Sequence, residues 1–76
     1  MVRAFIMAET AAGTAAELQE SVTNTEGIRE AHVVAGQYDI IAEAEGEEVY
    51  DVIHSVVTRL RDFEGLVDTR TYICLE

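Results

Sequence analysis

Lysine, proline and tryptophan are absent from this sequence, and cysteine occurs once. A single cysteine excludes an internal disulfide, so the fold does not depend on an oxidising compartment. The apolar stretch that follows Met1 is far shorter than a membrane span and is interrupted by Arg3. It also lacks the charged, apolar and small-residue zones of a signal peptide. We therefore expect a cytoplasmic protein that does not bind or enter a membrane.

Basic residues are scarce, because fifteen acidic residues face five basic ones, all of them arginine, and the net charge is −10. Counterion release on DNA or RNA requires a basic surface, so we expect no direct nucleic-acid binding. An acidic surface without lysine is typical of proteins from a high-salt cytoplasm, where salt screens the self-repulsion. Halophilic origin is therefore a hypothesis, and maximal stability in dilute buffer would contradict it.

Apolar residues make up 49% of the sequence, which favours a packed fold over disorder in spite of the net charge. The length of 76 residues indicates a single domain over residues 1–76. A chain of this size buries only about 60% of the surface that its unfolded form exposes. We therefore expect oligomerisation to add stability.

The hydrophobic periodicity predicts four strands and two helices. The strands are expected at residues 2–9, 28–35, 38–45 and 66–75. The first helix is predicted to begin at a capping box of Thr14 and Glu17 and to end before Gly27. Its apolar face consists of Ala15, Leu18 and Val22. The second helix has the stronger pattern, with an apolar stripe of Val49, Val52, Ile53, Val56, Val57 and Leu60.

The two halves of the sequence resemble each other. Glu26-Gly27-Ile28 returns in the second half as Glu64-Gly65-Leu66, and each half is predicted to be strand, helix, strand. Two such units form a split βαβ arrangement, whose right-handed crossovers place both helices on one face of the sheet. The predicted fold class is α+β, a ferredoxin-like βαββαβ sandwich with a four-stranded antiparallel sheet in the order 4-1-3-2.

One face of that sheet has no helix to cover it, yet the first strand carries apolar side chains on both faces. Either Phe5 and Met7, or Ile6 and its neighbours, lie on the uncovered face. An exposed apolar sheet is an interaction site, and a second copy packed sheet to sheet would cover it. We therefore expect a homodimer.

Gly36, Gln37, Tyr38 and Asp39 lie between the second and third predicted strands. Glycine lets a ligand approach the backbone, and the aspartate offers a negative charge beside amide groups. Such a loop can bind both ends of a zwitterion. From the residues alone, an ordinary hairpin turn of two residues, with Tyr38 and Asp39 starting the next strand, is the favoured interpretation of the same sequence.

Recognisable metal and catalytic motifs are missing. His32, His54 and Cys74 show no C-x-x-C or H-x-x-x-H spacing, which argues against a metal site. No Ser-His-Asp or Cys-His arrangement is evident, and carboxylates are so numerous that any acidic pair is uninformative. We expect no metal, no cofactor and no enzyme activity.

Three segments, in this order and at these spacings, carry a resemblance to a known family. They are Glu26-Gly27-Ile28, Gly36-Gln37-Tyr38-Asp39, and Glu64-Gly65-Leu66 followed by Thr69-Arg70-Thr71. From about residue 18 onward, the pattern resembles the effector-binding RAM domain of the leucine-responsive and asparagine-type feast/famine regulators (Lrp/AsnC). The resemblance implies the same ferredoxin-like fold, dimers associated through their sheets, and rings built from several dimers.

The resemblance also implies that a small effector, typically an amino acid, binds between dimers near the hairpin loop. Carried onto this sequence, the effector-binding residues are Gly36, Gln37, Tyr38 and Asp39 in the loop, with Thr69 and Thr71 in the last strand. In this interpretation Asp39 accepts the ammonium of the amino acid. The amides around Gly36 bind its carboxylate through charge-assisted hydrogen bonds.

Full-length regulators of this family carry a winged helix-turn-helix, for which this sequence leaves no room. The resemblance therefore implies a stand-alone effector domain of amino-acid metabolism, which regulates transcription by oligomerising with itself or with full-length relatives. Two alternatives stay open. A small dimeric ferredoxin-like enzyme of the monooxygenase type predicts a pocket within one subunit and turnover that depends on His32 or His54. An assembly module without a ligand predicts a ring indifferent to every amino acid.

Overall fold

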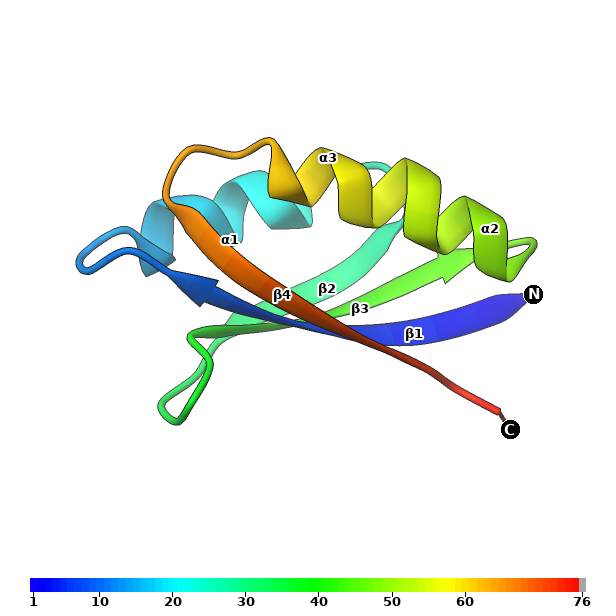
Figure 1. Cartoon of the computed structure of the whole chain (residues 1–76), viewed down its shortest axis with the longest axis horizontal. Coiled ribbons are helices and arrows are strands. Elements are labelled where there is room, and N and C mark those ends of the chain that lie inside the picture. Colours follow the sequence, from blue (N-terminus) through cyan, green and yellow to red (C-terminus); the bar gives the residue numbers. More distant parts are fainter. Residues whose placement is uncertain (76) are drawn as a thin grey trace.

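A single antiparallel sheet with helices on one face makes up the computed structural model, which describes residues 1–75 (Figure 1). Its strands are β1 (Val2–Thr10), β2 (Ile28–Val33), β3 (Ile40–Gly46) and β4 (Leu66–Ile73). They lie in the order β2-β3-β1-β4, which is the predicted order 4-1-3-2 counted from the other edge. The predicted ferredoxin-like fold class is therefore confirmed. The last strand ends two residues earlier than expected.

Two helices form a single layer over the sheet (Figure 1). The first helix is α1 (Ala15–Thr23). The second is a run of α2 (Val49–Asp51), a π-helical segment η1 (Val52–Val57) and α3 (Thr58–Arg61). Both pass over the same face of the sheet, as the right-handed crossovers require (Figure 1). Within residues 1–75, no helix is both long and apolar enough to cross a membrane.

The core lies between the helices and the sheet. On β1, Ala4, Ile6 and Ala8 face the helices and are at most 2% exposed. Small alanine side chains on β1 and β3 leave room for larger side chains from the helices. Those side chains are Leu18, Val22, Val52, Val56, Val57 and Leu60, all of them buried. Because Ile6 lies in this core, Phe5 and Met7 occupy the uncovered face, which decides between the two arrangements that the sequence allowed.

The predicted capping box at Thr14 is wrong. The Thr14 hydroxyl donates a hydrogen bond to the Ala11 carbonyl oxygen (2.7 Å) and does not cap the helix. α1 nevertheless begins at Ala15, directly after this residue. A capping box occurs instead at the second helix, where the Glu48 amide donates to Asp51 Oδ2 (3.1 Å).

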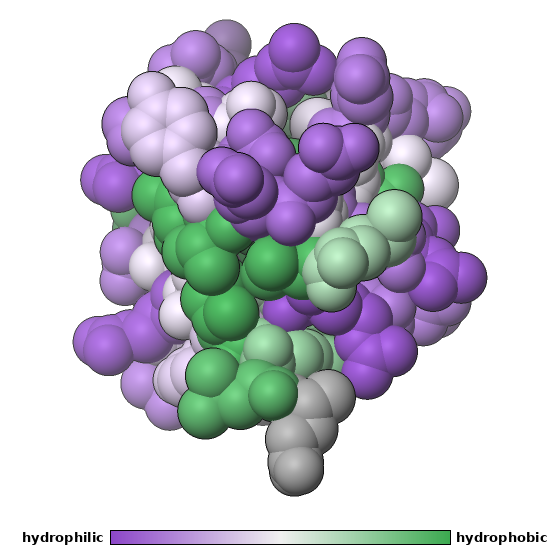
Figure 2. Space-filling model, turned by 90° about the vertical axis from the view of Figure 1, so that its right-hand side faces the viewer, coloured by the Kyte–Doolittle hydropathy of each residue, from purple (hydrophilic) through white to green (hydrophobic). Residues whose placement is uncertain are grey.

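The apolar stripe of the second helix is buried only in part. Val49 and Ile53 were expected in the core but are 46% and 38% exposed. The π-helical segment explains the difference, because a wider turn moves positions spaced by three and four residues off a common face. Apolar surface gathers at the end of the molecule that holds this helix start and both termini (Figure 2).

Candidate functional site

The loop between β2 and β3 has six residues, 34–39, and not the two that the sequence predicted. Val33 and Ile40 pair directly at the ends of the two strands. The Val34 amide donates to the Asp39 carbonyl oxygen (2.8 Å) and closes the base of the loop. Gly36 does not adopt a positive φ, which the tight two-residue turns require, and the hairpin therefore opens into a longer loop (Figure 1).

Asp39 fastens this loop to β1. Its amide donates to the Ala8 carbonyl oxygen (2.9 Å), and its Oδ2 accepts a hydrogen bond from the Thr10 amide (2.8 Å). Asp39 is half-buried, whereas Gly36 and Gln37 are exposed. The side chain is thus held in one position by the strand beside it. A carboxylate oxygen accepts more than one hydrogen bond, so the anchored side chain keeps acceptor capacity beyond its bond from Thr10.

The tip of the loop presents its backbone. A Cβ built at Gly36 would have no heavy atom within 4 Å, so a ligand can approach the chain closely there. Gln37 is exposed and adds an amide side chain, and Tyr38 is half-buried at the base. The structure therefore brings the four predicted loop residues together as amides and a carboxylate, the groups that bind a small zwitterion.

Thr69 and Thr71 lie apart from that loop. They pair with Ala8 and Ile6, which places both threonines on the helix-facing side of β4. β1 lies between β4 and β3, and two strand spacings correspond to about 10 Å. A shallow groove of ≈ 330 Å³ beside residues 68–72 includes both threonines and no loop residue. Within the described chain, the two threonines therefore do not join the loop in one site.

Histidines do not form a site with each other. His32 Nε2 on β2 lies 3.4 Å from Glu30 Oε1, whereas His54 stacks on Tyr50 in the second helix with ring centroids 4.2 Å apart. The hydrophobic core lies between sheet and helices, and the cavity that opens beside α1 is lined by neither His32 nor His54, on which the enzyme alternative depends. Across residues 1–75, no three histidine, cysteine or acidic side chains are gathered as a metal ion requires.

The uncovered sheet face mixes apolar and charged side chains. Arg3 lies 5.9 Å from the ring centroid of Phe5 and 3.8 Å from a carboxylate oxygen of Glu43. Arg29 donates a hydrogen bond to Glu45 (2.7 Å). This bond, together with the charges of Glu45 and Glu43, raises the pKa of the Arg29 guanidinium. The acidic residues of β3 are thus locally compensated, although the molecule as a whole is strongly negative.

Sequence reasoning missed the residues that hold Asp39 in place. Ala8 and Thr10 contribute only their backbone groups, which every residue type except proline supplies in full. No side-chain pattern identifies such a contact. The predicted end of the first strand at residue 9 also left Thr10 outside the sheet, although Thr10 pairs with Leu66 after a register shift between Glu9 and Thr10.

Comparison with known proteins identifies relatives over the whole described fold. The family model for the Lrp/AsnC ligand binding domain matches residues 3–76. An uncharacterised HTH-type transcriptional regulator from Pyrococcus furiosus is 30% identical over 60 residues, which is 79% of this chain and 40% of the relative. This chain therefore spans less than half of that curated relative.

Solved structures show the same fold. FFRP-DM1 is 33% identical, with a TM-score of 0.90 and coverage of 99% of this chain and 100% of that one. A transcriptional regulator from Neisseria meningitidis, solved as a complex with L-Met, is 22% identical with a TM-score of 0.84. The alignment covers 99% of this chain and 50% of that regulator, and at this identity it shows the fold alone.

Proposed function

The chain belongs to the Lrp/AsnC ligand-binding domain family, and from this premise we propose that it binds an amino acid at the β2–β3 loop and regulates transcription through oligomerisation. The family is one of transcriptional regulators, as is the relative from Pyrococcus furiosus. A role in binding, without catalysis, is consistent with that placement. We infer a cytoplasmic location for the same reason.

The anchored carboxylate of Asp39 is the observation that carries this proposal. Asp39 Oδ1 accepts a hydrogen bond from the ammonium of the amino acid. The amides around exposed Gly36 donate hydrogen bonds to the carboxylate of the amino acid. Both contacts are charge-assisted hydrogen bonds, which are stronger than neutral ones. Gln37 and Tyr38 complete the loop side of the site. The Neisseria meningitidis regulator with this fold was solved with L-Met, which supports an amino acid as the effector class.

We propose that a second subunit completes the site. Thr69 and Thr71 lie across β1 from the loop, and we infer that they contact an effector held at the loop of another chain. In a ring of dimers, the β4 edge of one subunit then contacts the loop of its neighbour. Effector binding and ring assembly become linked, because each stabilises the other. Full-length relatives with the same domain can join such a ring.

The dimer within this ring forms through the uncovered sheet face. A stable interface of standard size buries about 800 Å² per partner. That is roughly one sixth of the 4960 Å² surface of this chain. Half-buried Phe5 and Met7 supply apolar contact, and the ion pairs of Arg3 and Arg29 reduce the repulsion between two acidic sheets.

A thermal-shift panel of the twenty amino acids in high salt tests the effector site. Asp39→Asn is the informative variant, because it removes the charge and keeps an oxygen that can accept from Thr10, whereas Asp39→Ala also removes that anchor. Ligand at ~100 times its Kd adds about 2.7 kcal/mol to the stability of the parent. We expect a selective rise in Tm that Asp39→Asn abolishes.

Glu9→Gln is the matched control, since it removes one exposed charge from neighbouring β1 and leaves the loop intact. It should keep the full response. An equal response of Asp39→Asn and the parent would refute binding at this loop. A flat panel on a stable oligomer would instead indicate an assembly module without a ligand.

A further inference from the structure

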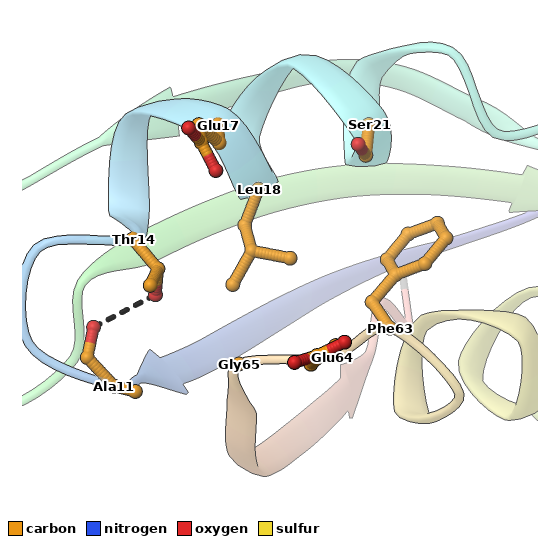
Figure 3. Close-up of a pocket in the computed structure, with 8 residues that line it drawn as sticks. All are labelled: Ala11, Thr14, Glu17, Leu18, Ser21, Phe63, Glu64 and Gly65. Atoms are coloured by element: carbon orange, nitrogen blue, oxygen red, sulfur yellow. Dashed lines mark hydrogen bonds between the residues drawn. The ribbon is translucent and has the colours of Figure 1, made fainter.

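A cavity of ≈ 650 Å³ opens between α1 and the connection from α3 to β4 (Figure 3). Pockets that bind small molecules have volumes of about 300 to 1,000 Å³. Its lining comes from three parts of the chain: the connection after β1, the first turns of α1, and residues 63–65. None of residues 36–39 lines it, so it is separate from the β2–β3 loop.

Two hydrogen bonds hold the base of this cavity. The Ala11 amide donates to the Gly65 carbonyl oxygen (2.7 Å), and the Thr14 hydroxyl donates to the Ala11 carbonyl oxygen (2.7 Å). A Cβ at Gly65 would lie 3.2 Å from Thr14 Oγ1 and 3.3 Å from Leu18 Cδ1. The two sides of the cavity thus approach closely at its base, and the shape exists before any ligand binds.

Apolar side chains form the floor and carboxylates stand at the rim. Leu18, which is 6% exposed, and half-buried Phe63 both project into the space between α1 and the facing connection (Figure 3). Glu17 on α1 and Glu64 on the facing connection are both exposed. The eight lining residues include no arginine or histidine. The α1 N-terminus contributes a positive charge of only about one half, which the two carboxylates outweigh.

We propose that this cavity binds a small organic ammonium ion with an apolar tail and without a carboxylate. Its ammonium lies between Glu17 and Glu64 and near the Phe63 ring, where charge-assisted hydrogen bonds and cation–π attraction both favour it. The tail covers Leu18. A free amino acid would bring its carboxylate to the same rim and be repelled by both glutamates. The cavity therefore selects an amine over the amino acid with the same side chain, which is the opposite preference to the loop.

A pair of ligands tests this selectivity directly. 3-Methylbutylamine and leucine share one side chain and differ by the carboxylate. In an NMR titration of the ¹⁵N-labelled chain, the amine should shift the amides of Ala11, Leu18 and Gly65, whereas leucine at the same concentration should leave them in place. The double variant Glu17→Gln/Glu64→Gln should raise the Kd of the amine by about tenfold or more.

Glu20→Gln/Glu47→Gln is the matched control. Both residues are exposed and lie outside the cavity, and the double substitution also removes two negative charges. It should change the Kd little, whereas equal weakening would show that the amine follows only the net charge. Absent shifts at the cavity amides, or equal shifts with leucine, would overturn the proposal. Asp39→Asn should keep the full amine response, so a failure of the loop site and a failure of the cavity are read separately.

Discussion

At the residue scale, two glycines determine where each half of the chain passes from helix to strand. Gly27 (φ 96°) and Gly65 (φ 94°) occupy equivalent places in the repeated segments, and both adopt the left-handed conformation. A Cβ at Gly27 would lie 2.6 Å from Val56 Cγ2, so the second helix packs directly on this backbone. The repeat seen in the sequence is thus a repeat of backbone geometry.

Gly27→Ala should lower the free energy of unfolding by about 2 to 4 kcal/mol, because it adds both a strained φ and a clash in the core. Gly36→Ala is the matched control. It has no positive φ and no atom near the new methyl group, so its free energy of unfolding should stay within about 1 kcal/mol of the parent. Urea denaturation at one protein concentration measures both. Equal effects of the two substitutions would contradict this account.

At the element scale, the sequence predicts more of the fold than of the site. The alternation of apolar residues in β1 and the repeat of the two halves were sufficient to predict the sheet order. Right-handed crossovers between strands leave few topologies for such a pattern. The sequence placed residues 36–39 together near one turn because they are adjacent along the chain. The geometry of the loop was not predicted. It depends on the φ of Gly36, on the bond from the Asp39 amide to the Ala8 carbonyl oxygen, and on the bond from the Thr10 amide to the Asp39 carboxylate.

Local signals also failed where two partners compete for one group. The Thr14 hydroxyl suited a capping box, but the Ala11 carbonyl oxygen lies within reach and takes its hydrogen bond. The exposure of Val49 and Ile53 depends on a π-helical segment, which the stripe of apolar residues did not predict. Which partner a group binds, and which turn a helix adopts, depends on the positions of backbone atoms in the folded chain. A pattern of residue types does not contain those positions.

Met7→Glu should convert the proposed dimer to monomers. Met7 is half-buried on the uncovered sheet face, where it pairs with Ile41 on one side and Arg70 on the other. A carboxylate there would be desolvated in a sheet-to-sheet contact, which costs several kcal/mol per charge. Sedimentation velocity measures the change. Val49→Glu is the matched control, because Val49 is 46% exposed and lies at the start of the second helix, on the opposite face of the sheet.

The Val49→Glu variant should sediment as the parent does. A Met7→Glu variant that keeps the parent's mass would exclude the uncovered sheet face as the dimer contact. A folded monomer, verified by its circular dichroism, is the expected product, since this position is outside the core that lies under the helices.

At the scale of the whole molecule, charge and size together set the response to salt. The chain measures 34 by 21 by 17 Å and carries a net charge of −10. The Debye length is about 10 Å at 0.1 M salt and about 3 Å at 1 M. In dilute buffer the carboxylates therefore repel one another across much of the molecule, whereas in molar salt only neighbours interact. Self-repulsion of this kind destabilises the compact state and also opposes association of subunits.

Tm should consequently rise by several degrees between 0.1 and 2 M NaCl, and the oligomer should be favoured over the same range. The variant Glu20→Gln/Glu47→Gln/Asp62→Asn separates screening from general salt effects, because it removes three exposed charges and reduces the net charge from −10 to −10 + 3 = −7. Its Tm should start higher in dilute buffer and rise less with salt, since less repulsion remains to be screened. Scanning calorimetry of both proteins measures the two slopes. A parent that is most stable in dilute buffer would refute the salt-adapted interpretation of this acidic surface, and parallel slopes would assign the rise to salt effects that do not depend on charge.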